Sequence, residues 1–96
     1  MGEIFSAHLG EQIAKSAIRL PGGQVYSEKR PARHGDLSKT LLKRGLKEEA
    51  AAGEQGFLTT LPRFVNKMDA AKIALASGQI QGLSKPEEGL RCEDVW

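Results

Sequence analysis

Paired β-prone segments around turns are the feature that most constrains the fold of this chain. Residues 17–20 and 24–26 are two short β-prone runs, and a Pro-Gly-Gly turn at residues 21–23 separates them. Proline presets one dihedral angle of a turn and glycine accepts positive φ, so this pattern predicts a β-hairpin. Residues 56–60 and 63–65 carry β-branched and aromatic side chains around a Leu-Pro pair, and they predict a second hairpin.

A helix is expected between the two hairpins. Its apolar stripe is formed by four leucines at helical spacing, Leu37, Leu41, Leu42 and Leu46. Pro31 disfavours a helical residue before it, so the helix should begin near Asp36, and Gly45 is a suitable C-terminal stop. Residues 48–56 are rich in alanine, glycine and acids, and they predict a loop.

A second helix and a tail are expected after the second hairpin. Asn66 is a favoured N-cap, and the helix should run to Ser77 and stop at Gly78. Residues 79–96 contain further glycines and a proline, which predict an extended tail. Trp96 supplies an apolar side chain through which such a tail could dock on the domain.

The expected architecture is a small single α+β domain over residues 16–96, with the order β-β-α-β-β-α and an extended C-terminal tail. Residues 1–15 have only loosely helical apolar spacing and predict a weakly held N-terminal segment. A 96-residue chain buries only about 60–65% of the surface that its unfolded form exposes. We therefore expect identical subunits to associate, as a dimer or a hexamer.

Cysteine and apolar content exclude several protein classes. Cys92 is the single cysteine, so no intrachain disulfide can form, and the two histidines His8 and His34 complete no zinc-site spacing. No apolar run is long enough to span a membrane, and the N-terminus lacks the order of a secretory signal. We expect a cytoplasmic protein with no metal and no cofactor.

Basic side chains are concentrated in one segment of the chain. Residues 29–47 carry seven lysines and arginines against one acid, whereas the whole chain has a net charge of +2. Such a segment indicates an anionic partner, which could be a nucleic acid, a nucleotide or an acidic protein. A solvated helix face is the alternative interpretation.

The stretch RPARHGD at residues 30–36 carries the strongest indication of a binding site. Arg30, Arg33 and His34 immediately precede the expected helix, whose first N–H groups and positive dipole end favour anions. Guanidinium groups bind phosphate in a bidentate manner, and Gly35 would let a ligand approach the backbone. These residues predict a phosphate or pyrophosphate site. Alternatively, Arg33 forms an ordinary ion pair and His34 fills space in the core.

Aromatic and amide side chains could complete a nucleotide site. Phe57 lies on an expected strand, where most rings belong to the core, but a ring beside an anion site would stack on a purine. Asn66 either caps its helix or presents its amide to a base or ribose. We recognise no catalytic triad, Walker loop or dinucleotide fingerprint, so we expect binding without catalysis.

Several segments occur in an order that is similar to a known family. They include RHGDL at residues 33–37, QGFLT at 55–59, RFVN at 63–66 and EDVW at 93–96. This order, over residues 16–96, resembles the first anti-Thoeris family, phage proteins that capture the cyclic ADP-ribose isomers made by bacterial TIR enzymes. The resemblance implies an oligomeric sponge in the cytoplasm of the infected bacterium. Such a protein binds a cyclic ADP-ribose isomer, or a cyclic oligonucleotide of a related defence system, without cleaving it.

The resemblance also implies roles for individual residues. Arg33 would hold the phosphates, Phe57 would stack on adenine, and Asn66 would hydrogen-bond the ligand. Arg63 lies in the matching RFVN segment and is a further candidate for ligand binding. Gly35 stands where the family has a second histidine, so the identity of the ligand stays open.

Two other functions stay open. The chain could be a phage inhibitor that binds a host defence protein complex directly, as anti-CRISPR proteins do, although such proteins are usually acidic and this chain is basic. It could also be a small RNA- or DNA-binding module that uses the basic segment of residues 29–47. Few aromatic residues and no recognised nucleic-acid motif argue against the latter function.

Overall fold

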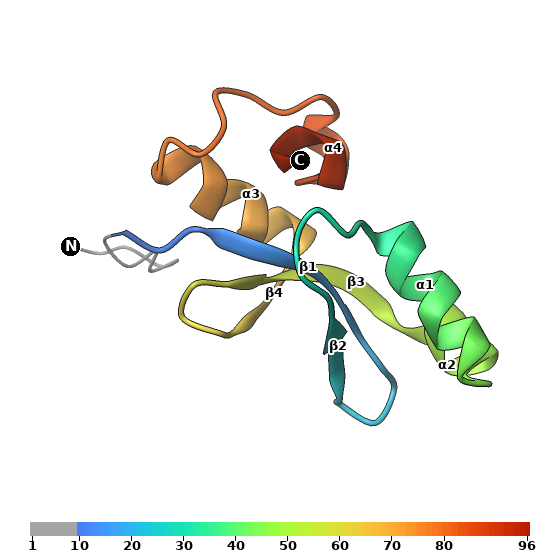
Figure 1. The fold of residues 1–96 in the computed structure, drawn as a ribbon. Helices are drawn as coiled ribbons and strands as arrows, with labels where there is room; N and C mark the ends of the chain where they lie inside the picture. Colours follow the sequence, from blue (N-terminus) through green and yellow to red (C-terminus); the bar gives the residue numbers. More distant parts are fainter. Residues whose placement is uncertain (1–9) are drawn as a thin grey trace.

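The computed structural model describes residues 10–96 and shows a sheet with helices packed on it (Figure 1). Four strands form an antiparallel sheet in the order β2-β1-β3-β4. They are β1 (Ile13–Arg19), β2 (Val25–Ser27), β3 (Glu54–Thr59) and β4 (Phe64–Asn66). The helices are α1 (His34–Lys43), α2 (Lys47–Ala52), α3 (Lys67–Ala76) and α4 (Cys92–Val95), with a 3-10 turn η1 at Pro86–Glu88. The predicted α+β class is confirmed.

Both predicted hairpins are present. In the first, Arg19 pairs with Val25 across the Pro-Gly-Gly turn, and the N–H of Gly23 donates to the carbonyl three residues earlier over 2.8 Å. Gly23 has a φ of 94°, which L side chains rarely adopt. In the second hairpin, Leu58 pairs with Phe64. Local turn chemistry is therefore sufficient to locate both hairpins.

The first strand begins earlier than the sequence indicates. Ile13 pairs with Thr59 of β3 and is 1% exposed, although its apolar spacing is loosely helical. The side-chain amide of Gln79 accepts from the N–H of Ile13 at 2.8 Å and donates to its carbonyl at 2.9 Å. Strand pairing and burial therefore outweigh the weak periodicity. Residues 1–9 of the expected N-terminal segment lie outside the described residues.

Helix α1 packs part of its predicted apolar stripe against the sheet, because Leu42 is 48% exposed and Leu46 lies beyond the end of the helix. It begins at His34, two residues before the expected start, and it buries Leu37 and Leu41 against Ile18 of β1. Gly45 has a φ of 78° and follows the C-cap, as the sequence predicts. The position of α1 is thus set by its leucines and by the glycine that ends it.

The prediction of a loop over residues 48–56 is wrong, because a helix and the start of a strand occupy this segment. Helix α2 covers Lys47–Ala52, and the carbonyl of Leu46 accepts from the N–H of Ala50 at 2.9 Å. Its alanines are strong helix formers, and the acids in its first turn complement the helix dipole. The strand β3 then begins at Glu54.

Helix α3 follows the prediction closely. The side-chain oxygen of Asn66 accepts from the N–H of Asp69 at 2.8 Å, which confirms the N-cap. Gly78, with a φ of 78°, follows the C-cap Ser77. Ala70, Ala71 and Ala74 of α3 are buried together with Ile73, so these small side chains let the helix lie close to the sheet.

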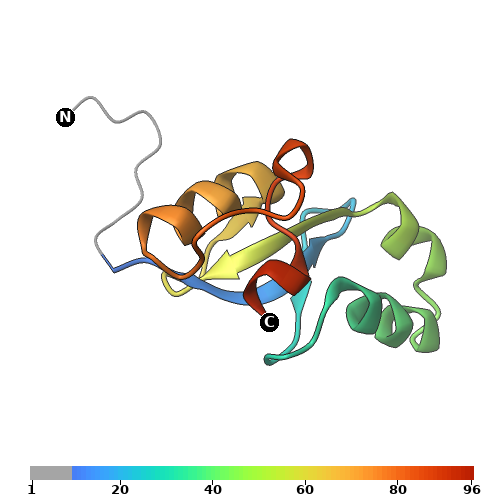
Figure 2. The same cartoon turned by 90° about the horizontal axis from the view of Figure 1, so that it is seen from above.

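The tail folds onto the domain instead of remaining extended. It forms η1 and α4, and Leu90 between them has no exposed surface. Gly89 permits this approach, because its φ is 80° and a Cβ there would lie 2.7 Å from the carbonyl carbon of Lys67. The indole N–H of Trp96 donates to the carbonyl of Ala32 over 3.1 Å. Trp96 therefore anchors the tail, as expected, beside the loop that leads into α1 (Figure 2).

Two hydrophobic clusters lie on one face of the sheet. The larger joins Ile13 and Phe57 to α3 and the tail, and the smaller joins Ile18 to the leucines of α1. Ser16 pairs with Phe57 and lies two residues before Ile18, so strand alternation directs all three side chains to the same face. His34, in the first turn of α1, packs against the Phe57 ring and links the clusters. Within the described part of the chain, no helix has the length and apolar character needed to cross a membrane.

Candidate functional site

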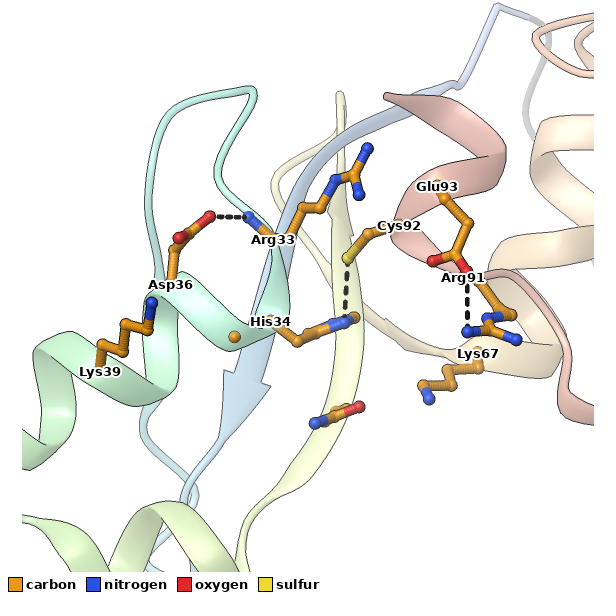
Figure 3. Close-up of a pocket in the computed structure, with 10 residues that line it drawn as sticks. Arg33, His34, Asp36, Lys39, Lys67, Arg91, Cys92 and Glu93 are labelled. Atoms are coloured by element: carbon orange, nitrogen blue, oxygen red, sulfur yellow. Dashed lines mark hydrogen bonds and ion pairs between the residues drawn. The ribbon is translucent and has the colours of Figure 1, made fainter.

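A basic pocket lies where the first turns of α1 and α3 and the docked tail meet β3 (Figure 3). Its volume is about 390 Å³, which is in the range of small-molecule sites. The residues that line it, within the part of the chain that the structure describes, are Arg33, His34, Gly35, Asp36, Lys39, Gln55, Lys67, Arg91, Cys92 and Glu93. We call residues 33–39 the α1 wall, and Lys67 with residues 91–93 the tail wall.

The α1 wall presents two cations near the start of the helix. The carboxylate of Asp36 accepts from the backbone N–H of Arg33 at 2.9 Å, which fixes the entry of the chain into α1. The guanidinium of Arg33 donates to the main-chain oxygen of Trp96 at 2.5 Å. A guanidinium has five N–H donors, so this contact leaves others for a ligand. Lys39 supplies the second cation of this wall.

The tail wall is assembled from two distant segments. Lys67 is the first residue of α3, and its carbonyl accepts from the N–H of Leu90 at 2.9 Å, which holds the tail beside it. Arg91 follows, and its guanidinium pairs with Glu93 at 2.7 Å and with Glu88 at 3.7 Å. These contacts orient the arginine along the edge of the pocket (Figure 3).

Positive charge dominates the pocket. Its described lining holds four cationic side chains against the carboxylates of Asp36 and Glu93. Both carboxylates are already engaged, the first by the backbone at the start of α1 and the second by Arg91. The remaining positive charge favours an anionic ligand. Among the described residues, no three His, Cys, Asp or Glu side chains are grouped so as to hold a metal ion.

A hydrogen-bonded His34–Cys92 pair forms the buried floor of the pocket (Figure 3). The Nε2 of His34 lies 2.7 Å from the carbonyl oxygen of Gly56, which can only accept, so Nε2 carries the proton. The Nδ1 of His34 then accepts from the Cys92 thiol at 3.1 Å. Burial lowers the pKa of His34, with a smaller contribution from Lys67, and burial raises the pKa of Cys92. At neutral pH the floor is an uncharged imidazole and an uncharged thiol.

Two of the residues predicted from the RPARHGD stretch line the pocket. They are Arg33 and His34, on the α1 wall. Arg30 lies outside the described lining, and its guanidinium carbon lies 5.2 Å from the centre of the Trp96 ring. Arg30 therefore holds the tail through a cation–π contact.

The other predicted residues have structural contacts away from the pocket. Phe57 is 0% exposed, and its ring packs edge-on against His34 at 5.1 Å and Trp96 at 6.3 Å between ring centres, so no ring face is accessible to a base. Asn66 caps α3. Arg63 donates to the buried carboxylate that precedes β1 at 2.8 and 3.0 Å. None of the three belongs to the described lining.

The tail wall carries the residues that the sequence did not reveal. Lys67 follows the predicted cap Asn66, and Arg91 and Cys92 lie in the expected tail, but no local pattern indicates that these segments meet. Lys39 belongs to the basic segment, which signals an anionic partner without locating the site. The long-range docking of the tail is what makes these residues neighbours.

Fold and pocket together define a small α+β protein with a basic pocket of ligand size. A sequence model described as phage T4 y16D protein matches residues 12–96, which include both walls of the pocket. The chain belongs to the phage T4 y16D protein family, and it is therefore a phage protein. No curated protein and no solved structure is significantly similar to it. The family description names no ligand or activity, so the anti-Thoeris resemblance stays a prediction.

Proposed function

We propose that this phage protein binds a cyclic nucleotide immune signal in the basic pocket and sequesters it without cleaving it. The observation that carries the proposal is the convergence of Arg33, Lys39, Lys67 and Arg91 on one pocket. Within the described residues, Lys39 and Lys67 have no carboxylate partner, so their charge is available to a ligand. Lysine and arginine clusters of this kind bind phosphate groups.

Cations on two walls suit a ligand with more than one phosphate. Arg33 and Lys39 approach the pocket from one wall, and Lys67 and Arg91 approach it from the other. A cyclic ADP-ribose isomer carries a pyrophosphate, and cyclic oligonucleotides carry a phosphate at each linkage. The resemblance to the first anti-Thoeris family favours the cyclic ADP-ribose isomer, with the cytoplasm of the infected host as the place of action.

The state of His34 and Cys92 supports sequestration over catalysis. A nucleophilic cysteine reacts as the thiolate, and a general base needs a free lone pair near the reacting atom. Here the pKa of the Cys92 thiol is raised, and the Nδ1 lone pair of His34 is occupied by that thiol. The pair therefore favours a packed floor under the ligand.

Self-association is part of the proposal. Met68 and Leu75 are 50% and 43% exposed, and they lie seven residues apart on α3, so they share one side of the helix. Covering these side chains in a partner subunit would remove apolar surface from water. This supports a homo-oligomeric sponge.

Calorimetric titration with cyclic ADP-ribose isomers and cyclic di- and trinucleotides tests the binding. Removing a cation that binds phosphate should weaken the ligand about tenfold to a hundredfold, so we expect this for Lys39→Ala and Lys67→Ala. Lys43→Ala is the matched control, because Lys43 is exposed on α1 and lies outside the described lining.

Two further outcomes decide the mechanism. Ligand that is recovered intact after heat denaturation of the complex would support sequestration, and a cleaved product would contradict it. Absence of binding to every nucleotide would overturn the proposal. Capture of a host defence complex by the nucleotide-free protein would then support the direct inhibitor.

A further inference from the structure

A second cavity lies between α1, α2 and the first residues of β3. Its volume is about 410 Å³, and it is lined by Ser38 and Leu42 of α1, by Lys47, Ala50 and Ala51 of α2, and by Gln55. Gly53 also lines it and lets α2 lie close to the sheet, because a Cβ there would lie 2.8 Å from the Cγ2 atom of Ile18. The cavity therefore lies beside the short connection at Gly53 between α2 and β3.

The second cavity and the basic pocket share one lining residue. Gln55 lines both, and Ser38 of the second cavity precedes Lys39 of the first in the same helix. Gln55 lies two residues before Phe57 on β3, so strand alternation directs its side chain to the face that the helices cover. Gln55 is therefore the point at which the two cavities adjoin.

The chemistry of the second cavity differs from that of the basic pocket. Leu42 is 48% exposed, and with Ala50 and Ala51 it forms an aliphatic surface. Polar groups stand around this surface, namely the hydroxyl of Ser38, the amide of Gln55 and the ammonium of Lys47. Within the described residues, these three side chains form no hydrogen bond or ion pair. Their hydrogen-bonding capacity is open to a ligand.

We infer that the second cavity is the nucleobase subsite of the same ligand. This inference rests on the proposed function, since it requires phosphates in the basic pocket. The flat face of a purine would cover Leu42, Ala50 and Ala51, and its edge offers both donors and acceptors to Gln55 and Ser38. The ribose would then pass Gln55 between the two cavities.

Because Phe57 is buried, a nucleobase needs a different surface on which to pack. The ring that the family resemblance assigns to adenine has no accessible face in this structure. Leu42, in the cavity that shares Gln55 with the basic pocket, supplies exposed apolar surface instead. The two cavities therefore offer cations for phosphates and an apolar surface for a base.

The test compares a probe with a base and a probe without one. Cyclic ADP-ribose and cyclic di-AMP carry a purine, whereas inorganic pyrophosphate carries only the charge. Leu42→Ser should weaken the purine probes about tenfold and leave pyrophosphate unchanged, because it removes apolar contact and no charge. Leu61→Ser is the matched control, an exposed leucine in the turn between β3 and β4 outside both cavities, and it should change neither.

Each outcome separates the subsite from the proposed function. If Leu42→Ser binds purine probes like the unchanged protein while Lys67→Ala weakens them, the base lies elsewhere and only the subsite is overturned. Equal weakening of all probes by Leu42→Ser would also overturn it, because Leu42 would then act on the whole pocket. If the unchanged protein binds none of the probes, the proposed function and the subsite both fail.

Methyl NMR gives a second measurement that does not depend on a substitution. A purine face within contact distance shifts nearby methyl resonances through its ring current. The methyl signals of Leu42 and Ala51 should move on addition of cyclic ADP-ribose and stay in place with pyrophosphate. Shifts that are confined to other methyl groups would contradict the subsite.

Discussion

The two walls of the basic pocket carry the same kind of charge but are assembled in different ways. The α1 wall is one continuous stretch, residues 33–39, and the hydrogen bond between Asp36 and Arg33 sets its start. The tail wall joins Lys67 to residues 91–93, and it exists only because the tail docks through η1 and α4. The α1 wall is therefore a local structure, whereas the tail wall is a tertiary one.

The contacts between the walls show what this difference means for the pocket. His34 and Arg33 on the α1 wall bond to Cys92 and Trp96 of the tail. If the tail were undocked, α1 would keep its backbone hydrogen bonds and its buried leucines Leu37 and Leu41 on the sheet, but Arg91 and the thiol of Cys92 would leave the pocket. Substitutions can therefore show whether the two walls are energetically separable.

The largest loss of stability is expected for a residue that packs against both walls. Phe57 packs against both His34 and Trp96, so Phe57→Ala should disturb both walls. Loss of a fully buried ring should lower the free energy of unfolding by about 3–5 kcal/mol. Urea denaturation measures it, with Phe64→Ala as a control on a half-buried ring. Equal losses from the two variants would contradict this role of Phe57.

The next largest loss of stability should come from a substitution that loosens the tail wall and leaves the α1 wall in place. Gly89→Ala places a Cβ 2.7 Å from the backbone of Lys67 at a φ of 80°, which should cost about 1–3 kcal/mol of stability. Gly82→Ala is the control, because nothing lies within 4 Å of its added Cβ. Hydrogen exchange should show faster exchange in residues 90–96 and little change in α1. Equal acceleration in α1 would mean that the walls are not separable.

This contrast also explains how much of the fold could be predicted. The hairpin at Gly23 and the cap at Asn66 depend on the chemistry of a few adjacent residues, and both are present. The strand position of Ile13 could not be predicted from sequence, because its partners Thr59 and Gln79 are remote in the chain. The sequence predicts a loop in place of α2, because alanines next to glycine fit a loop as well as a short helix.

The candidate site follows the same rule. Arg33 and His34 could be predicted because an anion site at a helix start is a local pattern. Lys67 and Arg91 could not, because their neighbourhood depends on the path of the tail. Phe57 has two interpretations from sequence, and only the packed structure shows that its ring is fully buried beside His34 and Trp96.

Acid should loosen the contact between the walls. The pKa of His34 lies below its ordinary value of 6.5 because burial disfavours the charged ring. The unfolded chain therefore binds a proton first as the pH falls, so stability should be full above about pH 6.5 and decline below it. Denaturation at pH 7 and pH 5.5 measures the decline. His34→Gln should reduce it, and an unchanged decline in that variant would contradict the role of His34.

The smallest effect is expected at the exposed contact between the walls. The guanidinium of Arg33 donates to the main-chain oxygen of Trp96 where water can replace it, so Arg33→Lys should lower stability by about 0.5 kcal/mol. The same substitution should weaken pyrophosphate about threefold to tenfold, because lysine cannot bind phosphate in a bidentate manner. Arg30→Lys is the control, since Arg30 contacts Trp96 but lies outside the described lining. If Arg33→Lys changed stability and left pyrophosphate affinity intact, Arg33 would only join the walls and would not bind the ligand.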